Sequence, residues 1–404
     1  MNPLRAKSLT RIGWLRGLSI PSDWAESKVK YVAPGMQAGE AITAESIEPT
    51  GTYPVYGGNG LRGYTEQKTH HGTRILIGRQ GALCGNVHLV SGEYWVSEHA
   101  IVVRPSDTTN ARWLAYLLEV MNLGQYSQTA AQPGIGTAQI NALSIPVPPA
   151  QEQRAIADYL DRETARIDTL IEEQQRLIEI LSERKMAAMA TATASGEPVA
   201  LRRVVTRIRQ GWSPNCESRP PNGVTEWGVL KVGCSNSGTF DPTESKRLPD
   251  ETTPRPEFVV EPGEIVMSRA NTKELVGASA VVDRAYPRLM LSDLNYGLTV
   301  GTGVDPEFVS YALRSGHVRY QISLASKGTS PSMQKISQRD IRDLILQLPS
   351  LDEQRRIVVD LGEQTAKIDS LITEAERFIE LSRERRSALI TAAVTGQIDV
   401  REVA

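Results

Sequence analysis

The chain has 404 residues and a mass of 44.3 kDa, which is enough for two or three domains and excludes a peptide-sized or disulfide-held scaffold. Its composition, 40% hydrophobic and 23% charged, is that of a folded globular protein and excludes a disordered one. The three cysteines form no CxxC pair, which argues against a zinc ribbon. No apolar run is long enough for a membrane span or a secretory signal, so we expect a cytoplasmic protein.

Charge is distributed in blocks, although the net charge is only −2. Residues 1–150 carry +2, 151–199 carry −4, 200–350 carry +3 and 351–404 carry −3. Positive and negative blocks thus alternate twice. This alternation suggests an internal duplication, and it bears on the partners of the chain rather than on its fold.

The first block combines β-like runs with one helical segment. The segments 75–90 (ILIGRQGALCGNVHLV) and 95–103 (WVSEHAIVV) are β-like, and 111–122 has the apolar spacing of a helix. The segment 58–63 (GNGLRG) matches the dinucleotide-binding pattern GxGxxG, but neither a helix nor a suitably placed acidic residue follows it. We therefore interpret it as a loop.

A long amphipathic helix is predicted next, and it recurs 201 residues later. Residues 152–187 and 353–388 share 18 of 36 positions, and each copy follows a proline-marked stretch and starts with acidic residues. At 1.5 Å per residue, such a helix would be about 57 Å long. The predicted coiled-coil seam, spaced near 3.5 residues, consists of Leu160, Ile167, Leu170, Leu177 and Leu181 in the first copy and of Ile357, Leu361, Ile368, Leu371 and Phe378 in the second.

Further apolar residues widen the stripe beyond a two-helix seam and predict a second partner surface. They are Ile171, Ile178 and Ile180 in the first helix and Ile372, Ile379 and Leu381 in the second. Because each helix trails its own globular region, we expect the two helices to pair antiparallel and these residues to dock another protein.

The globular regions are duplicated more loosely. The segment 265–282 (IVMSRANTKELVGASAVV) parallels 75–90, so that Arg269 occupies the slot of Arg79, and 290–300 is again β-like. A helix is predicted over 306–323. We therefore predict an α+β fold with an internal pseudo-two-fold repeat: mixed α/β domains at 1–149 and 196–349, separated by long antiparallel coiled-coil helices at 150–195 and 350–404, the last with a C-terminal tail.

The ordered motifs resemble those of the specificity subunit of type I DNA restriction-modification systems. The resemblance runs almost end to end and is carried by IPSDWAESKVKYV, YPVYGGNGLRGYT, ILIGRQGALCGN, WVSEHAIVV, IPVPPAQEQRAIADYLD, EPGEIVMSR and TAAVTGQIDVR. It implies two target-recognition domains, each binding one part of a split DNA site, and helices that bind two modification subunits, which methylate adenine at N6. A motor-nuclease subunit would join them in defence against foreign DNA. S-adenosylmethionine, ATP and Mg are then expected on the partner subunits, with no cofactor in this chain.

Candidate DNA contacts are loop residues of the types that contact base edges or phosphates. In the first domain they are Tyr56, Asn59, Arg62, Tyr64, Arg79 and Gln80; in the second they are Arg269, Asn271, Lys273, Lys327, Gln334 and Lys335. Arg79 and Arg269 are expected to contact phosphate, because residues common to both domains cannot explain different targets. The differing loops predict an asymmetric gapped site, whose half-site centres would lie at most about 17 base pairs apart.

Enzymatic chemistry is not predicted for this chain. It has no GxxxxGK[ST] loop, no metal-ligand spacing among its five histidines, and no Asn or Asp followed by Pro-Pro and an aromatic residue, the signature of adenine methyltransferases. Ser97 and His99 alternate on one strand face, as do Cys84 and His88, without a complete triad. The alternative function is a non-catalytic protein-binding scaffold of the same architecture.

Overall fold

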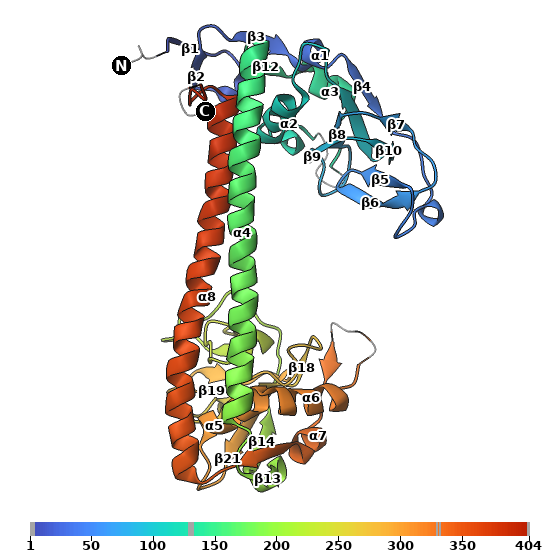
Figure 1. Ribbon diagram of the computed structural model, residues 1–404. Coiled ribbons are helices and arrows are strands. Elements are labelled where there is room, and N and C mark those ends of the chain that lie inside the picture. The colour runs from blue at the N-terminus through green and yellow to red at the C-terminus, as the bar shows by residue number, and fades with distance from the viewer. Residues whose placement is uncertain (1–4, 128–132, 329, 331–332, 402–404) are drawn as a thin grey trace. The chain divides into compact units, whose positions relative to one another are not determined.

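The computed structural model describes residues 5–127, 133–328, 330 and 333–401 (Figure 1). The chain divides into two compact units: unit 1 comprises 1–174 and 377–404, and unit 2 comprises 175–376. Each unit contains one globular domain and one half of each long helix. Within the described residues, no helix is both long and apolar enough to cross a membrane.

The globular domain of unit 1 is built around a four-stranded antiparallel sheet of order β4-β11-β8-β9. Its strands are β4 (Gly35–Ala38), β11 (Ala100–Arg104), β8 (Arg74–Gly78) and β9 (Val87–Val90). A second sheet consists of β6 (Gly60–Thr65), β5 (Tyr53–Gly57), β10 (Glu93–Val96) and β7 (His70–His71), in that order, with β5 and β10 parallel. Short elements complete the domain: α1 (Val29–Val32), α2 (Ala111–Val120), α3 (Thr137–Ala142), β3 (Ala25–Lys28) and its antiparallel partner β12 (Ser144–Val147).

Unit 2 repeats this topology, which confirms the predicted duplication. Its four-stranded sheet has the order β14-β21-β17-β19, with β14 (Val205–Gln210), β21 (Asn295–Val300), β17 (Ile265–Ser268) and β19 (Ser279–Val281). The second sheet has the order β16-β15-β20, with β16 (Ser245–Arg247), β15 (Gly228–Leu230) and β20 (Leu289–Met290), and β15 pairs parallel with β20, as β5 does with β10. Further elements include α5 (Pro306–Arg314), α6 (Gly316–Ala325), α7 (Gln338–Asp343) and the pair β13 (Glu197–Ala200) and β23 (Ile345–Leu348). The helix predicted over 306–323 is thus two helices, broken at Ser315, whose ψ of 150° is extended.

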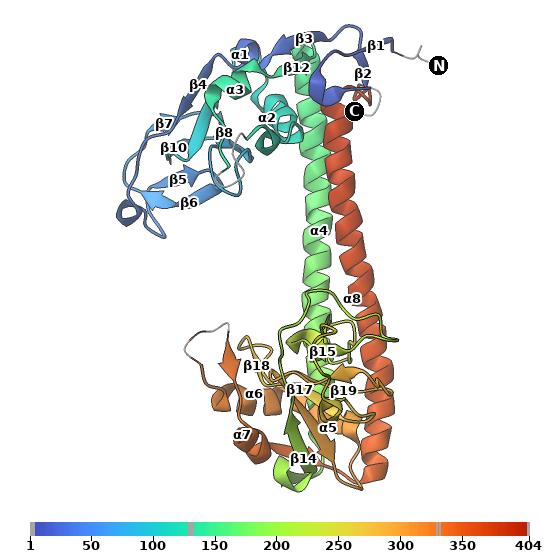
Figure 2. The ribbon, with the colours of Figure 1, turned by 180° about the vertical axis from the view of Figure 1, so that it is seen from behind.

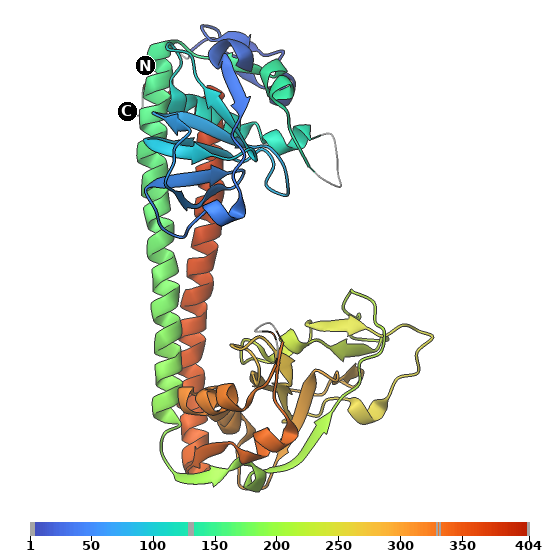
Figure 3. The same cartoon turned by 90° about the vertical axis from the view of Figure 1, so that its right-hand side faces the viewer.

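The central sheet of each unit is buried on both faces, which explains the nearly continuous apolar runs of its strands. In unit 1, Ile75 and Ile77 of β8 pack toward the long helices, whereas Leu76 between them packs toward the second sheet. In unit 2, Ile265 of β17 packs toward the long helices, and its neighbour Val266 packs toward the second sheet. Figure 3 shows the sheet of β15 and β16 on the side of unit 2 away from the long helices.

The two long helices pack together antiparallel, as predicted. They are α4 (Ala150–Ala192) and α8 (Leu351–Val394). Within unit 1 the beginning of α4 lies beside the end of α8 (Figures 1 and 2), and Arg386 Nε donates to Asp168 Oδ1 at 3.0 Å. Within unit 2, Lys185 Nζ donates to Asp369 Oδ1 at 2.6 Å. Both partners of the second pair are related to those of the first by the repeat offset of 201, so each unit contains the same ionic contact once.

The residues of the predicted seam are buried near the domains and exposed in the middle of the helices. The seam residues Leu160, Ile167, Leu181, Ile357, Leu361 and Ile368 are buried. In contrast, Leu170, Leu177, Leu371 and Phe378 are 37–48% exposed, whereas Ile379, predicted to dock a partner, is 7% exposed. The helices carry two apolar stripes, and 3.5-residue spacing does not identify which of them the neighbouring helix covers.

One buried glutamine on each long helix joins that helix to its domain. Gln153 Oε1 accepts from the Asn110 amide at 2.9 Å, just before α2, and its Nε2 donates to the Pro148 carbonyl at 3.0 Å. Gln354 makes the corresponding bonds to Asp305 N and Pro349 O, both at 2.8 Å. The long helix thereby fixes the start of the helix that covers the central sheet.

Candidate nucleic-acid interface

In the first domain, the glycine-rich turn at 57–60 lies directly against the end of β8. A Cβ atom added to Gly78 would lie 2.5 Å from the Gly58 carbonyl oxygen, and one added to Gly58 would lie 2.9 Å from the His99 carbonyl oxygen. Both contacts are with backbone atoms, so only glycine permits this close approach. The turn thereby brings Asn59 to the loop that carries Arg79 and Gln80. The predicted loop is found only at 58–59, because β6 begins at Gly60.

Three of the first-domain candidates meet at this point. Arg79 is exposed, Gln80 Nε2 lies 2.7 Å from His99 Nδ1, and Asn59 Oδ1 accepts from Asn86 Nδ2 at 3.3 Å. The adjoining hollow is lined by Arg79, Gln80, Pro133, Gly134, Ile135 and Gly136. Arg79 and Gln80 thus share one hollow with residues 133–136, while Gln80 and Asn59 are each paired with another side chain.

The other three first-domain candidates lie on the second sheet. Tyr56 is half-buried and packs edge-on against Tyr94, with ring centroids 5.8 Å apart, so it contributes to the core. Tyr64 is half-buried on β6, where its backbone pairs with Glu48. Arg62 is exposed, and its side chain passes over Gly57.

In the second domain, two short strands gather most of the candidates. β18 (Ala270–Asn271) pairs with β22 (Gln334–Lys335), and Lys327 forms a further bridge to Lys335. The adjoining hollow is lined by Arg269, Tyr296, Lys327, Lys335, Ile336, Ser337, Arg339, Asp340 and Asp343. The two carboxylates of this hollow have other partners: Asp340 accepts from Ser337, the N-cap of α7, and Asp343 accepts from Arg202. The hollow's four cationic side chains are therefore not paired with them.

Side-chain bonds distinguish these second-domain candidates. Arg269 Nη1 donates to the Asp293 carbonyl at 3.2 Å, and Asn271 Nδ2 donates to Asn236 Oδ1 at 3.1 Å. Gln334 Nε2 donates to the Ser330 carbonyl at 2.8 Å, so this amide is turned toward its own loop. Lys273 is exposed in the connection between β17 and β19.

Arg79 and Arg269 are held by the same pair of backbone hydrogen bonds, which we call the backbone frame. The Arg79 amide donates to the His99 carbonyl at 2.9 Å, and the Arg79 carbonyl accepts from Ile135 N at 2.9 Å. Arg269 makes the same two bonds, to Leu294 O at 2.8 Å and from Ile336 N at 3.0 Å. Each domain therefore presents an arginine from the same backbone position.

Sequence reasoning missed Asn86, Asn236 and Arg339. Arg339 shares the second hollow through the start of α7, and the two asparagines pair with candidates from other loops. The sequence shows that the asparagines lie in loops, but it does not show that they pair, because the paired residues are 27 and 35 positions apart.

Of the four side chains that alternate on strand faces, His99 and Cys84 have hydrogen-bond partners, whereas Ser97 Oγ and His88 Nε2 are buried without one in the described part of the chain. The His99 ring binds Gln80, and burial raises the pKa of the Cys84 thiol, whose sulfur lies 3.5 Å from the Arg79 carbonyl. Burial likewise lowers the pKa of His88. In the part of the chain that the structure describes, no group of three His, Cys, Asp or Glu residues is placed to hold a metal ion.

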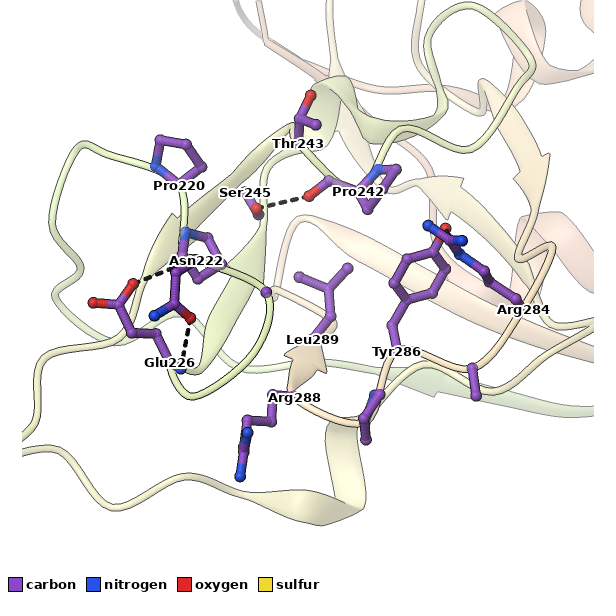
Figure 4. Close-up of a pocket in the computed structure, with 14 residues that line it drawn as sticks. Pro220, Asn222, Glu226, Pro242, Thr243, Ser245, Arg284, Tyr286, Arg288 and Leu289 are labelled. Atoms are coloured by element: carbon purple, nitrogen blue, oxygen red, sulfur yellow. Dashed lines mark hydrogen bonds between the residues drawn. The ribbon is translucent and has the colours of Figure 1, made fainter.

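A separate hollow in unit 2 lies between the connections 220–226, 242–245 and 284–289 (Figure 4). Asn222 Oδ1 accepts from the Glu226 amide at 3.1 Å, and the hydrogen bond from Arg219 lowers the pKa of Glu226 to about 2. These bonds close the loop on itself. The hollow contains neither matched arginine, so we do not assign it to the interface.

Part of the chain matches a family model and curated proteins. The family model "Type I restriction modification DNA specificity domain" matches residues 21–181, which include most of the first domain and the first part of α4. The EcoprrI specificity subunit of Escherichia coli is 42% identical over 151 residues, 36% of this chain and 38% of that protein. The EcoEI specificity subunit of Escherichia coli is 27% identical over 47% of this chain and 32% of that protein. The chain thus spans about a third of the length of these two relatives.

Two comparisons extend over nearly the whole chain. The MjaVIII specificity subunit of Methanocaldococcus jannaschii is 23% identical over 96% of both chains. A solved structure described as "Structural basis underlying complex assembly and conformational transition of the type I R-M system" covers 94% of this chain and 100% of its own, with a TM-score of 0.68 and 16% identity, and thus shares the fold. The chain is thus similar to type I restriction-modification specificity subunits over nearly its whole length, and it matches the DNA specificity domain over residues 21–181.

Proposed function

We propose that the chain is the non-catalytic DNA-reading subunit of a type I restriction-modification complex and that each repeat reads one half of a bipartite, asymmetric site. One observation carries the proposal: the same backbone frame presents Arg79 in one domain and Arg269 in the other, while the surrounding loops differ. A shared frame positions each domain on DNA, and differing loops give the two domains different targets.

The two arginines are assigned to phosphate contact. Neither reads a base in this proposal, because a residue common to both domains cannot distinguish two half-sites. The second hollow adds Lys327, Lys335 and Arg339, which strengthen the sequence-independent attraction to the DNA backbone. Asn59 and Gln80 are of the types that bind base edges.

The long helices are assigned to spacing and docking. At 1.5 Å per residue, the 43 residues of α4 correspond to about 65 Å, which limits the distance between half-site centres to roughly 19 base pairs. Docking of two modification subunits is assigned to the partly exposed Ile171, Ile178, Ile180, Ile372 and Leu381. Ile379 is removed from this set because its side chain is buried.

Chemistry belongs to the partner subunits in this proposal. The modification subunits would bind S-adenosylmethionine and methylate adenine, and a motor-nuclease subunit would use ATP and Mg. The chain itself supplies the site selection.

The decisive experiment maps N6-methyladenine across a host genome. The chain is expressed with its neighbouring modification subunit, and the genome is read by single-molecule sequencing. A gapped asymmetric motif modified on both strands is expected. A continuous motif, or a gap of several helical turns, would contradict the spacing role, and failure to form a complex would favour a protein-binding scaffold.

A further inference from the structure

Each domain contains one pair of asparagine side chains that joins the same two connections of the fold. In the first domain, Asn86 Nδ2 donates to Asn59 Oδ1 at 3.3 Å. In the second, Asn271 Nδ2 donates to Asn236 Oδ1 at 3.1 Å. Asn59 and Asn236 are exposed, whereas Asn86 and Asn271 are partly buried.

The connections correspond although the sequences do not align there. Asn59 lies between β5 and β6, and Asn236 lies between β15 and β16, which occupy the same places in the second sheets. Asn86 and Asn271 both lie in the connection that begins with the matched arginine, near its end and near its start respectively. The two domains thus reach the same pairing from different loop positions.

The pairing orients the exposed amide. Because Oδ1 of Asn59 and of Asn236 accepts from the partner asparagine, this hydrogen bond favours one orientation of each exposed amide before a ligand binds. Among the described residues, neither exposed Nδ2 donates to a protein atom, and each Oδ1 keeps a second lone pair. An amide held in this way loses little conformational entropy when it binds.

The remaining donor and acceptor match one base. Adenine presents the N7 acceptor and the N6 amino donor side by side in the major groove, and an asparagine amide binds both at once. Guanine presents two acceptors there and would meet the Oδ1 lone pair with a second acceptor. Both pairs also lie next to an arginine assigned to phosphate contact: Asn59 follows Gly58, which packs against Gly78, and Asn271 follows Arg269 by two residues.

We propose that Asn59 and Asn236 each read an adenine, one per half-site, and that Asn86 and Asn271 orient them. This inference rests on the proposed DNA-reading function and assigns its specificity-determining residues. Replacing Asn59 or Asn236 by alanine should remove the preference for adenine at one base pair of one half-site and leave the preference at the other half-site unchanged. A phosphate contact would instead weaken binding to all sequences alike.

The test uses the full chain in complex with its modification subunit and a library of duplexes with a random central region. Bound DNA is sequenced for the wild type, Asn59→Ala and Asn236→Ala. Each variant should lose preference at a single adenine in its own half-site, by about 5- to 150-fold in relative affinity. The untouched half-site serves as an internal control for folding.

A second measurement isolates the base contact. The adenine is replaced by 7-deazaadenine, which lacks the N7 acceptor, in a duplex that carries the selected motif. The wild type should lose affinity for this duplex, whereas the corresponding alanine variant should bind both duplexes equally. Asn86→Ala and Asn271→Ala should weaken preference at the same base pair, since they release the reader without removing it.

The outcomes distinguish the proposed DNA-reading function from the asparagine assignment. If the wild type selects a gapped motif and both alanine variants retain it, the proposed function stands and the asparagine assignment is wrong. If the wild type selects no motif, both are wrong. The assignment is established if an alanine variant loses preference at a single adenine and binds the 7-deazaadenine duplex as well as the adenine duplex, while the wild type binds the 7-deazaadenine duplex more weakly.

Discussion

Replacing the buried Gln153 by leucine should destabilise unit 1. The Gln153 side chain is 4% exposed and satisfies two backbone groups, the Asn110 amide and the Pro148 carbonyl. Leucine fills a similar volume but bonds neither group. Each buried group left without a partner costs about 1–3 kcal/mol, partly offset by the added apolar burial, so we expect a net loss of about 2–4 kcal/mol.

The effect should be large enough to measure by thermal unfolding. For a unit of roughly 200 residues, this loss corresponds to a Tm lowered by about 4–16 °C. Hydrogen exchange should locate it at the start of α2, where the Asn110 amide loses its acceptor. Gln354, which is 1% exposed, offers the same test in unit 2 at the start of α5.

The matched control is Gln151→Leu, two residues earlier in α4, where the side chain is exposed. It makes the same chemical change without burial, and we expect its stability to stay within about 0.5 kcal/mol of the wild type. If Gln153→Leu were as stable as this control, the glutamine would not join the long helix to its domain, and the reasoning would be refuted.

Three further predictions concern the interface, the helices and the buried thiol. Arg79→Ala and Arg269→Ala should each weaken DNA binding alike across sequences and reduce the slope of log affinity against log salt by about 0.9, measured by titration at several salt concentrations; a changed motif with an unchanged slope would contradict phosphate contact. Ile180→Glu and Leu381→Glu, at side chains that are each 52% exposed and related by the repeat, should each cost one bound modification subunit in native mass spectrometry, and a full complement in the double variant would exclude this docking surface. Burial raises the pKa of Cys234 to about 12, and since the thiolate is the reactive form, this thiol should resist iodoacetamide in the native protein at pH 8 and react after denaturation; rapid native labelling would contradict its burial.

Several features of the molecule follow from the sequence alone. The repeat can be recognised because the two helices are identical at half of the aligned positions. The apolar strands 75–78 and 265–268 can be recognised because a sheet buried on both faces requires nearly continuous apolar runs. The correspondence of Arg79 and Arg269 was also visible, since the backbone frame around each arginine imposes a similar local pattern.

Other features depend on contacts between distant segments. The sequence placed Tyr56 among the DNA contacts, but its ring packs against Tyr94. The pairing of Asn59 with Asn86 depends on the close approach of Gly58 to Gly78, which no local pattern reveals.

In the long helices, too, some features follow from the sequence and others from tertiary contacts. Sequence alone determined that they are long, amphipathic and duplicated, because helical periodicity and identity are properties of the chain itself. Only the tertiary structure decided that Ile379 is buried while Phe378 is exposed. An apolar stripe wider than one seam can be covered in more than one way, and the neighbouring helix selects the face that also brings Asp168 to Arg386 and Asp369 to Lys185.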